Sequence, residues 1–193
     1  GQFLKAITLV RLSHYNQAMK IADRLASLPD FVYLAMALKG EILMRQDKKQ
    51  DAMNLLKQIP ATSLNDGRIR MQRAIAYASG KLPKLAIQDW ETIAKQGGHD
   101  VAARRALACL YAAVPTGKNK QSALKNAQIA IKLSDDDWSC LVAMALAQSC
   151  NGEKQKALDF ARQATDKAKD SNHLYCQSLV TQIEQDEPIA WRY

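Results

Sequence analysis

The sequence of 193 residues has few aromatic residues, which make up 6% of it, and few residues that break helices, with eight glycines and five prolines. It contains no run of about 18 apolar residues, so no segment is expected to span a membrane. No secretory signal peptide is visible either. Because alanine is abundant among the hydrophobic residues, which make up 48% of the chain, the composition favours helices that pack closely through small side chains.

Cysteine is also scarce, and its spacing is not that of a metal site. The four cysteines form no CxxC pair and no zinc-type pattern. We therefore expect buried free thiols, which favour a reducing compartment and a cytoplasmic protein. The chain begins at Gly1 rather than at methionine, which leaves room for upstream sequence. The cysteines are Cys109, Cys140, Cys150 and Cys176.

Motifs for catalysis are missing as well. Gly117-Lys118 lacks the upstream glycine and the preceding strand of a phosphate-binding loop. The acidic run 135–137 lacks the spacing of a calcium loop and is expected to cap a helix. We therefore expect no catalysis, no metal and no cofactor. The histidines lie far apart and form no cluster with cysteines or acids: His14, His99 and His173.

The charge is basic, with 27 lysines and arginines against 19 acidic residues and a formal net charge of +8. Nucleic acid, anionic lipid and an acidic protein are all compatible with this charge. The charge alone does not choose among them.

The main signal is an internal repeat. Ala18, Ala52 and Ala86 are separated by 34 residues, Ala123 follows after 37, and Ala157 follows after another 34. A second set of small residues keeps the same steps: Ala6, Gly40, Ala74, Ala108 and Ala145. Both irregular steps are explained by three extra residues near 115–120, which we expect to form a lengthened turn.

Each repeat carries two apolar-periodic stretches, which run in the last repeat over about 138–150 and 154–169. Their steps of three, four and seven residues are helical, and Gly152 separates them. Small residues at the crossing let the two helices approach closely, because a large side chain there would hold the backbones apart.

In this spacing the chain resembles the tetratricopeptide repeat family, whose 34-residue unit is a helix–turn–helix. The resemblance implies an all-α fold, a right-handed α-solenoid of such units, and a single superhelical domain over 1–193. Arg73 and Lys39 stand where the family usually has leucine. The repeats are placed at about 1–32, 33–66, 67–100, 101–137 and 138–171.

One more amphipathic helix is expected at 172–185, with Leu174, Tyr175, Leu179 and Ile183 as its apolar stripe. A repeat array needs such a helix to cover its last apolar face. The tail, residues 186–193, contains two aromatic residues and either folds back onto this capping helix or binds another molecule.

Two surfaces are candidates for partner binding. The resemblance implies that certain positions of each first helix line a concave face, which here is apolar with several arginines that could meet carboxylates. The turns between the two helices of each repeat carry lysines that would form a basic rim. The concave-face candidates are Phe3, Arg11, Leu34, Glu41, Met44, Arg45, Arg68, Met71, Ile75, Arg105, Val142 and Leu146. The rim candidates are Lys48, Lys49, Lys81, Lys84, Lys118, Lys120, Lys154 and Lys156.

We therefore expect a non-catalytic scaffold or adaptor that binds an extended or helical segment of a partner protein. The alternative is a regulatory or targeting segment of a larger, membrane-anchored or enzymatic protein. A third interpretation is a basic array that binds an anionic surface or nucleic acid. Nucleic acid is disfavoured, because no aromatic residues alternate with the rim lysines to stack on bases.

Overall fold

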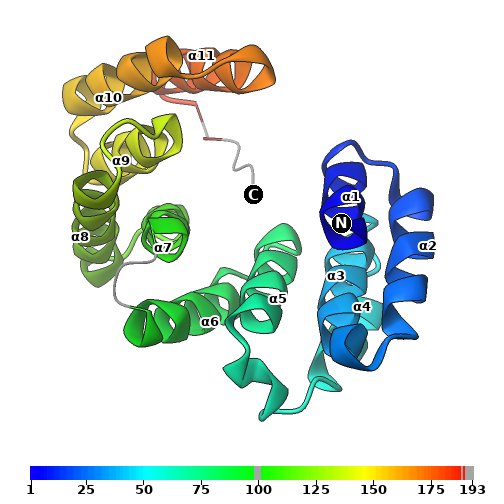
Figure 1. Cartoon of the computed structure of the whole chain (residues 1–193). Helices are drawn as coiled ribbons and strands as arrows, with labels where there is room; N and C mark the ends of the chain where they lie inside the picture. Colours follow the sequence, from blue (N-terminus) through cyan, green and yellow to red (C-terminus); the bar gives the residue numbers. More distant parts are fainter. Residues whose placement is uncertain (98–100, 188, 190–193) are drawn as a thin grey trace. The chain divides into compact units, whose positions relative to one another are not determined.

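The computed structural model describes residues 1–97, 101–187 and 189, and this part of the chain is helical throughout, without strands (Figure 1). Two short 3-10 turns, Pro29–Phe31 and Ser63–Asn65, precede the third and fifth helices. The helices are α1 (Gln2–Arg11), α2 (Tyr15–Ala26), α3 (Val32–Arg45), α4 (Lys49–Lys57), α5 (Gly67–Ser79), α6 (Pro83–Gln96), α7 (Val101–Ala113), α8 (Gly117–Leu133), α9 (Trp138–Cys150), α10 (Lys154–Lys167) and α11 (Asp170–Glu184).

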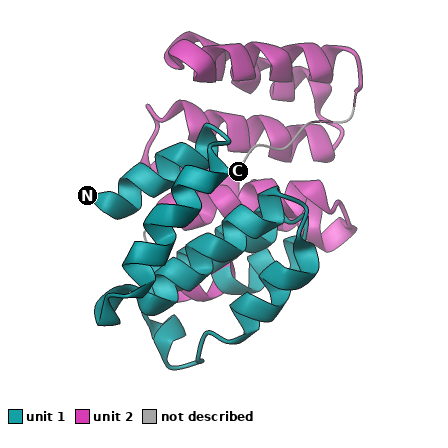
Figure 2. Cartoon of the chain, turned by 90° about the vertical axis from the view of Figure 1, so that its right-hand side faces the viewer, with its two compact units in different colours: residues 1–89, 193 teal, residues 90–192 magenta. Residues whose placement is uncertain are grey.

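The chain forms two compact units, residues 1–89 (unit 1) and residues 90–192 (unit 2), coloured separately in Figure 2. Within each unit consecutive helices pack as antiparallel pairs, such as α1 with α2 and α9 with α10. We call the first helix of each pair an A helix and the second a B helix. The prediction of one superhelical domain over 1–193 stays a prediction.

The small residues lie where A and B helices cross. The five alanines of the first set and the four alanines of the second have no exposed surface. At Gly40 a Cβ atom would lie 2.5 Å from Cδ2 of Leu56, which is itself fully buried. The helices therefore approach so closely that a side chain larger than alanine's does not fit at the alanine crossings, and at Gly40 even a Cβ is too large.

The A–B turns that follow α1, α3, α5 and α9 share one backbone conformation, which the turn after α7 does not adopt. Ser13, Asp47, Lys81 and Gly152 all have positive φ, between 56° and 85°, and each lies five residues before a buried alanine. In each of these turns the residue after the positive-φ residue donates its N–H to the carbonyl five residues before it, as Lys48 does to Leu43 at 2.9 Å. This is the Schellman motif that ends a helix. Only Gly152 adopts the left-handed conformation without a steric penalty.

The prediction of a lengthened turn at 115–120 is wrong. Helix α8 begins at Gly117 and has 17 residues, three more than α10. Thr116 caps it by accepting a hydrogen bond from the N–H of Asn119 at 3.3 Å, and the Asn119 side chain donates to the Val114 carbonyl at 2.7 Å. Because the cap precedes the inserted residues, they extend the helix and not the turn.

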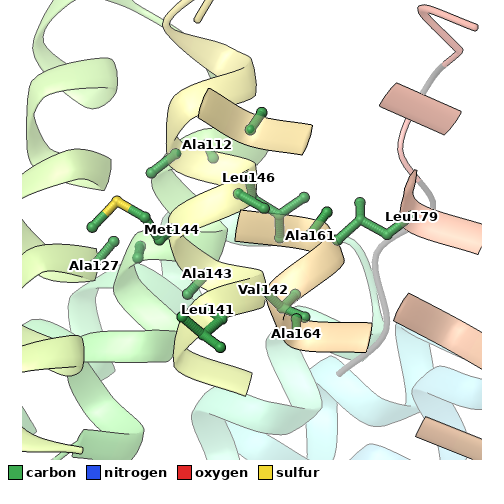
Figure 3. Close-up of a cluster of buried hydrophobic side chains, with 14 of the residues drawn as sticks. Ala112, Ala127, Leu141, Val142, Ala143, Met144, Leu146, Ala161, Ala164 and Leu179 are labelled. Carbon is green, nitrogen blue, oxygen red and sulfur yellow. The ribbon is translucent and has the colours of Figure 1, made fainter. Parts of the chain in front are cut away.

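Helix α9 is the centre of the core of unit 2. Eight consecutive residues, from Cys140 to Ala147, are buried, and Figure 3 shows Leu141, Met144 and Leu146 among the alanines of neighbouring helices. The helix begins and ends where the periodicity predicted. Asp137 caps it by accepting a hydrogen bond from the N–H of Ser139 at 2.9 Å, so the predicted capping by the acidic run is confirmed.

Helix α11 packs on α10 with a different stripe from the predicted one. Leu179 and Ile183 are buried, but Leu174 is 67% exposed and Cys176 is fully buried. Leu174 lies five residues, or about 140°, from Leu179 on the helix, so it points away from the face that Cys176, Leu179 and Ile183 share. Assigning Leu174 to the stripe was wrong.

The end of α11 repeats the turn of the A helices. Asp186 has a φ of 53° and follows Gly152 by 34 residues, and Glu187 donates its N–H to the Gln182 carbonyl at 2.9 Å. Beyond this turn, Ile189 packs against the core of unit 2. The two aromatic residues of the tail lie outside the described residues.

Candidate functional site

The predicted concave-face residues differ widely in exposure. Five of them are too deeply buried to offer surface to a partner: Leu34, Glu41, Met44, Val142 and Leu146. Five more are half-buried: Phe3, Arg45, Met71, Ile75 and Arg105. Arg11 and Arg68 are exposed. In unit 1 the accessible candidates therefore lie mainly on α1 and α5.

Arg45 is bound to a buried acid of its own helix. Its Nε donates to Oε1 of Glu41 at 2.8 Å, and Nε2 of Gln72 on α5 donates to Oε2 of the same carboxylate at 2.6 Å. Glu41 is 4% exposed, so both oxygens of a buried charge are hydrogen-bonded. This network joins α3 to α5 and is structural.

Two further candidate arginines also have internal partners. Nη2 of Arg68 lies 2.6 Å from Oδ2 of Asp66, and this side-chain hydrogen bond lowers the pKa of Asp66. In unit 2, Arg105 donates to the Ser139 hydroxyl and lies 3.6 Å from a carboxylate oxygen of Asp137. Asp66 and Asp137 cap the helices α5 and α9. These arginines thus reinforce helix starts.

Arg11 and Arg68 are the candidates that remain open to a ligand carboxylate. Arg11 is exposed and forms no ion pair within the described part of the chain. The ion pair of Arg68 is exposed, with 68% of the Arg68 side chain accessible. Solvent screens an exposed pair of this kind, so the pair is weak and an incoming carboxylate can compete for Arg68.

The two charged residues at leucine positions each have an acidic partner on a B helix. Lys39 lies 2.6 Å from Asp23 of α2. Arg73 donates to both oxygens of Asp89 on α6, at 2.8 and 2.6 Å, and lies over the ring of Tyr77. Asp89 is only 3% exposed. A bidentate charged pair therefore replaces apolar packing at this crossing.

The next repeat has a related polar contact. Arg104 donates to Oδ1 of Asn126 at 3.1 Å and to the Ala94 carbonyl at 3.4 Å. Arg70 lies 3.6 Å from Asp89 at the matching positions, one repeat earlier. The partners Asp89 and Asn126 were missed at the sequence level. The signal was available, because both occupy the same place in the repeat, three residues after its buried alanine.

A cavity of about 440 Å³ lies beside this contact in unit 2. In it the Tyr111 hydroxyl donates to Oε1 of Glu91 at 2.5 Å, and burial, followed by this bond, raises the pKa of Tyr111. Most of its polar groups thus already bind one another. A second cavity, of about 400 Å³, lies in unit 1 at the first two A–B turns. The cavity in unit 2 is lined by Glu91, Ala94, Lys95, Arg104, Leu107, Tyr111 and Asn126.

The four cysteines are free, as expected, and Cys140 and Cys176 are buried. Burial raises the pKa of Cys109 to about 12 and the pKa values of Cys140 and Cys176 to about 11. These thiols are therefore protonated at neutral pH and are not activated nucleophiles. In the described ranges no group of three histidines, cysteines or acids could hold a metal ion.

The rim lysines differ between the units. In unit 1 they are exposed and form no ion pair in the described part of the chain: Lys48, Lys49, Lys81 and Lys84. In unit 2, Lys154 lies 2.8 Å from Asp186 and Lys156 lies 3.0 Å from Glu153. Lys118 and Lys120 belong to the first turn of α8, as a result of the insertion.

Paired helices with a 34-residue step, buried small residues at each crossing and a shared turn define a helical repeat protein. The fold is that of tetratricopeptide repeat proteins. No protein-family model and no curated protein matches the sequence, so the evidence for this fold is structural.

Solved structures of this fold resemble the chain at low sequence identity. YrrB, described as a TPR protein with an unusual peptide-binding site, has a TM-score of 0.59 at 15% identity, covering 92% of this chain and 90% of its own. Yeast Tom70 has a TM-score of 0.70 at 14% identity, over 96% of this chain but 39% of its own. A MamA mutant has a TM-score of 0.58 at 16% identity, covering 86% of this chain and 95% of its own.

Proposed function

We propose that this chain is a non-catalytic scaffold that binds a partner protein on the A helices of unit 1. The partner segment is extended or helical and carries acidic residues beside apolar ones. The binding surface, called here the A-helix face of unit 1, consists of Phe3, Ile7, Arg11, Arg68, Met71 and Ile75.

The observation that carries this proposal is the presence of accessible apolar side chains at equivalent positions of α1 and α5, with an exposed arginine on each of the two helices. Phe3, Ile7, Met71 and Ile75 are only half-buried. The corresponding positions of α3 are filled by buried residues, and the Glu41 network links α3 rigidly to α5. A preorganised apolar surface flanked by open guanidinium groups suits an acidic and apolar segment.

Two of the structural neighbours support a partner-binding role. YrrB is described as having a peptide-binding site, and a structure of Naa15/Naa10 bound to HypK-THB matches at a TM-score of 0.58 and 17% identity. The free thiols fit a reducing compartment, and a cytoplasmic location stays a prediction.

The test is a selection of peptides from a random phage-displayed library on the immobilised wild-type chain. We expect enrichment of peptides with acidic and apolar residues. In fluorescence polarisation, the double variant Arg11→Glu, Ile75→Asp should bind them at least about tenfold more weakly, which corresponds to 1.4 kcal/mol.

The matched control is Arg24→Glu, Ile87→Asp, because Arg24 is exposed on α2 and Ile87 is half-buried on α6. This control should keep the wild-type affinity. Equal loss in both variants, or peptides without acidic residues, would contradict the proposal. Circular dichroism of all variants establishes that each is folded.

A second candidate function is a regulatory or targeting segment of a larger protein. The chain covers only 39% of yeast Tom70 and 28% of the matching chain of the Naa15/Naa10 complex. Detection of the native protein by an antibody raised against this chain tests this candidate. A polypeptide mass well above 21.4 kDa for the protein from its natural source supports this candidate. A polypeptide mass equal to that of the chain contradicts it.

A further inference from the structure

The positive charge of the protein is concentrated in unit 1. Residues 1–89 contain fourteen lysines and arginines and seven acidic residues, a formal net charge of +7. Residues 90–192 contain thirteen lysines and arginines and twelve acidic residues, which gives a formal net charge of +1. A surface on unit 1 that binds an anionic partner therefore has far more positive charge available than any surface on unit 2.

The rim lysines of the two units also differ in their internal ion pairs. Four of the seven acids of unit 1 are bound to basic residues: Asp23, Glu41, Asp66 and Asp89. The four rim lysines of unit 1 form no ion pair within the described part of the chain. In unit 2, Lys154 also donates to the Glu184 carbonyl at 2.9 Å, in addition to its bond to Asp186. Two of the four equivalent lysines of unit 2, Lys154 and Lys156, are thus engaged in ion pairs.

The shared turn conformation places the A–B turns of unit 1 at one edge. Their positive-φ residues, Ser13, Asp47 and Lys81, occupy the same place in three successive repeats. Neighbouring packed helices are about 8–10 Å apart, so these turns form a row of projecting tips. We call this row, with the lysines that it carries, the basic edge: Lys48, Lys49, Lys81 and Lys84. The acids on it are Asp47 and Asp51.

An apolar side chain projects from the same edge. Leu12 ends α1 at the first A–B turn and is 60% exposed. Tyr15, the aromatic residue of that turn, is half-buried against the core of unit 1. The nearby cavity is lined by uncharged polar residues and a histidine and not by the lysines. Apart from Tyr15 and His14, which line this cavity, the edge offers no ring to stack on bases, and the cavity has no lysine or acid to hold a charged peptide.

We propose that the basic edge of unit 1 docks on a bilayer that contains anionic phospholipid. Projecting lysines can all reach a flat, fluid surface at once, and an exposed leucine among them can enter the boundary between headgroups and acyl chains. The cytoplasmic leaflet carries such negative charge. The described helices include none long and apolar enough to cross a membrane. The proposed membrane contact uses residues outside the A-helix face of unit 1.

The experiment is vesicle co-sedimentation of the full chain with vesicles of phosphatidylcholine containing about a third phosphatidylserine. We compare the wild type with a variant that replaces Lys48, Lys49, Lys81 and Lys84 by glutamine. The control variant replaces Lys118, Lys120, Lys154 and Lys156 by glutamine. Both variants lose four charges, so a difference between them reports position and not net charge.

We expect the wild type to bind the anionic vesicles and not pure phosphatidylcholine vesicles. Since each lysine contributes about fivefold to binding, the unit 1 variant should lose at least about a hundredfold, and the control less than about tenfold. Raising the salt from 0.1 to 0.5 M should release the wild type. Leu12→Ser should weaken binding severalfold without changing the charge.

Three results would overturn the proposal. The first is a wild-type chain that does not sediment with anionic vesicles at 0.1 M salt. The second is equal loss in the two lysine variants, which would mean that only net charge matters. The third is tighter binding of the basic edge to duplex nucleic acid or to polyglutamate than to vesicles, which would assign it to another class of partner.

Discussion

The contact between Arg73 and Asp89 allows a quantitative test of how α5 and α6 are held together. Asp89→Ala removes two charge-assisted hydrogen bonds, of 2.8 and 2.6 Å, and leaves Arg73 and Arg70 without their acid. The side chains of these arginines are only 17% and 14% exposed. Breaking a buried pair on one side costs about 3–5 kcal/mol, because an uncompensated charge stays buried. We expect a loss of this size.

Urea unfolding followed by tryptophan fluorescence measures this loss. Trp90 adjoins Asp89 and is 4% exposed, so its emission reports the region directly once Trp138 and Trp191 are replaced by phenylalanine. Asp166→Ala, at an exposed position on α10, is the control and should change the free energy of unfolding by less than about 0.5 kcal/mol.

The double variant Arg73→Leu, Asp89→Leu tests the reasoning itself. It removes both charges of the bidentate pair and restores the residue usual at this place in the repeat. Replacing a buried ion pair by apolar residues is often neutral, so the double variant should be at least about 1 kcal/mol more stable than Asp89→Ala. A double variant as unstable as the sum of its single substitutions would refute the explanation by an uncompensated charge.

Three further predictions follow from the turns, the crossings and the thiols. Gly152→Ala should lower the free energy of unfolding by about 1 kcal/mol, because a Cβ is strained at a φ of 85°; thermal unfolding measures it. Gly40→Ala should cost about 1–3 kcal/mol in urea unfolding, because its Cβ would lie 2.5 Å from Leu56, and unchanged stability would show that the core yields there. Burial raises the pKa of Cys140 and Cys176 from 9.0 to about 11, so the folded state binds more protons than the unfolded state between these values. Their contribution is complete below about pH 9 and falls as the pH rises toward 11; a Cys140→Ala, Cys176→Ala variant should show a shallower decline over that range.

The repeat frame was readable from the sequence because small residues are required at every helix crossing. Ala18 and its equivalents are fully buried for that reason, and their spacing predicted the helix pairs and the bounds of α9. The left-handed turn was recognisable at Gly152 only, since Ser13, Asp47 and Lys81 adopt the same conformation without being glycine. The tertiary context overrides local preference at those three turns.

The candidate surfaces were harder to predict, because the sequence does not show which charged groups meet. Glu41 and Gln72 are 31 residues apart in the sequence, yet they are joined by a hydrogen bond. The same Glu41 carboxylate accepts a hydrogen bond from Arg45, which makes Arg45 less available to a ligand. The capping acids of α5 and α9 also pair with Arg68 and Arg105, although the Arg68 side chain stays 68% exposed. Leu174 was misassigned because the buried face of α11 is formed by Cys176, Leu179 and Ile183, and Leu174 lies about 140° from Leu179 around the helix.

Hydrogen exchange measured by mass spectrometry tests the central claim most directly. The wild-type chain is compared alone and with a selected acidic and apolar peptide. We expect protection on binding to be concentrated in α1 and α5, with little change in the B helices α2 and α4. Protection confined to the B helices, or to unit 2, would contradict binding on the A-helix face of unit 1.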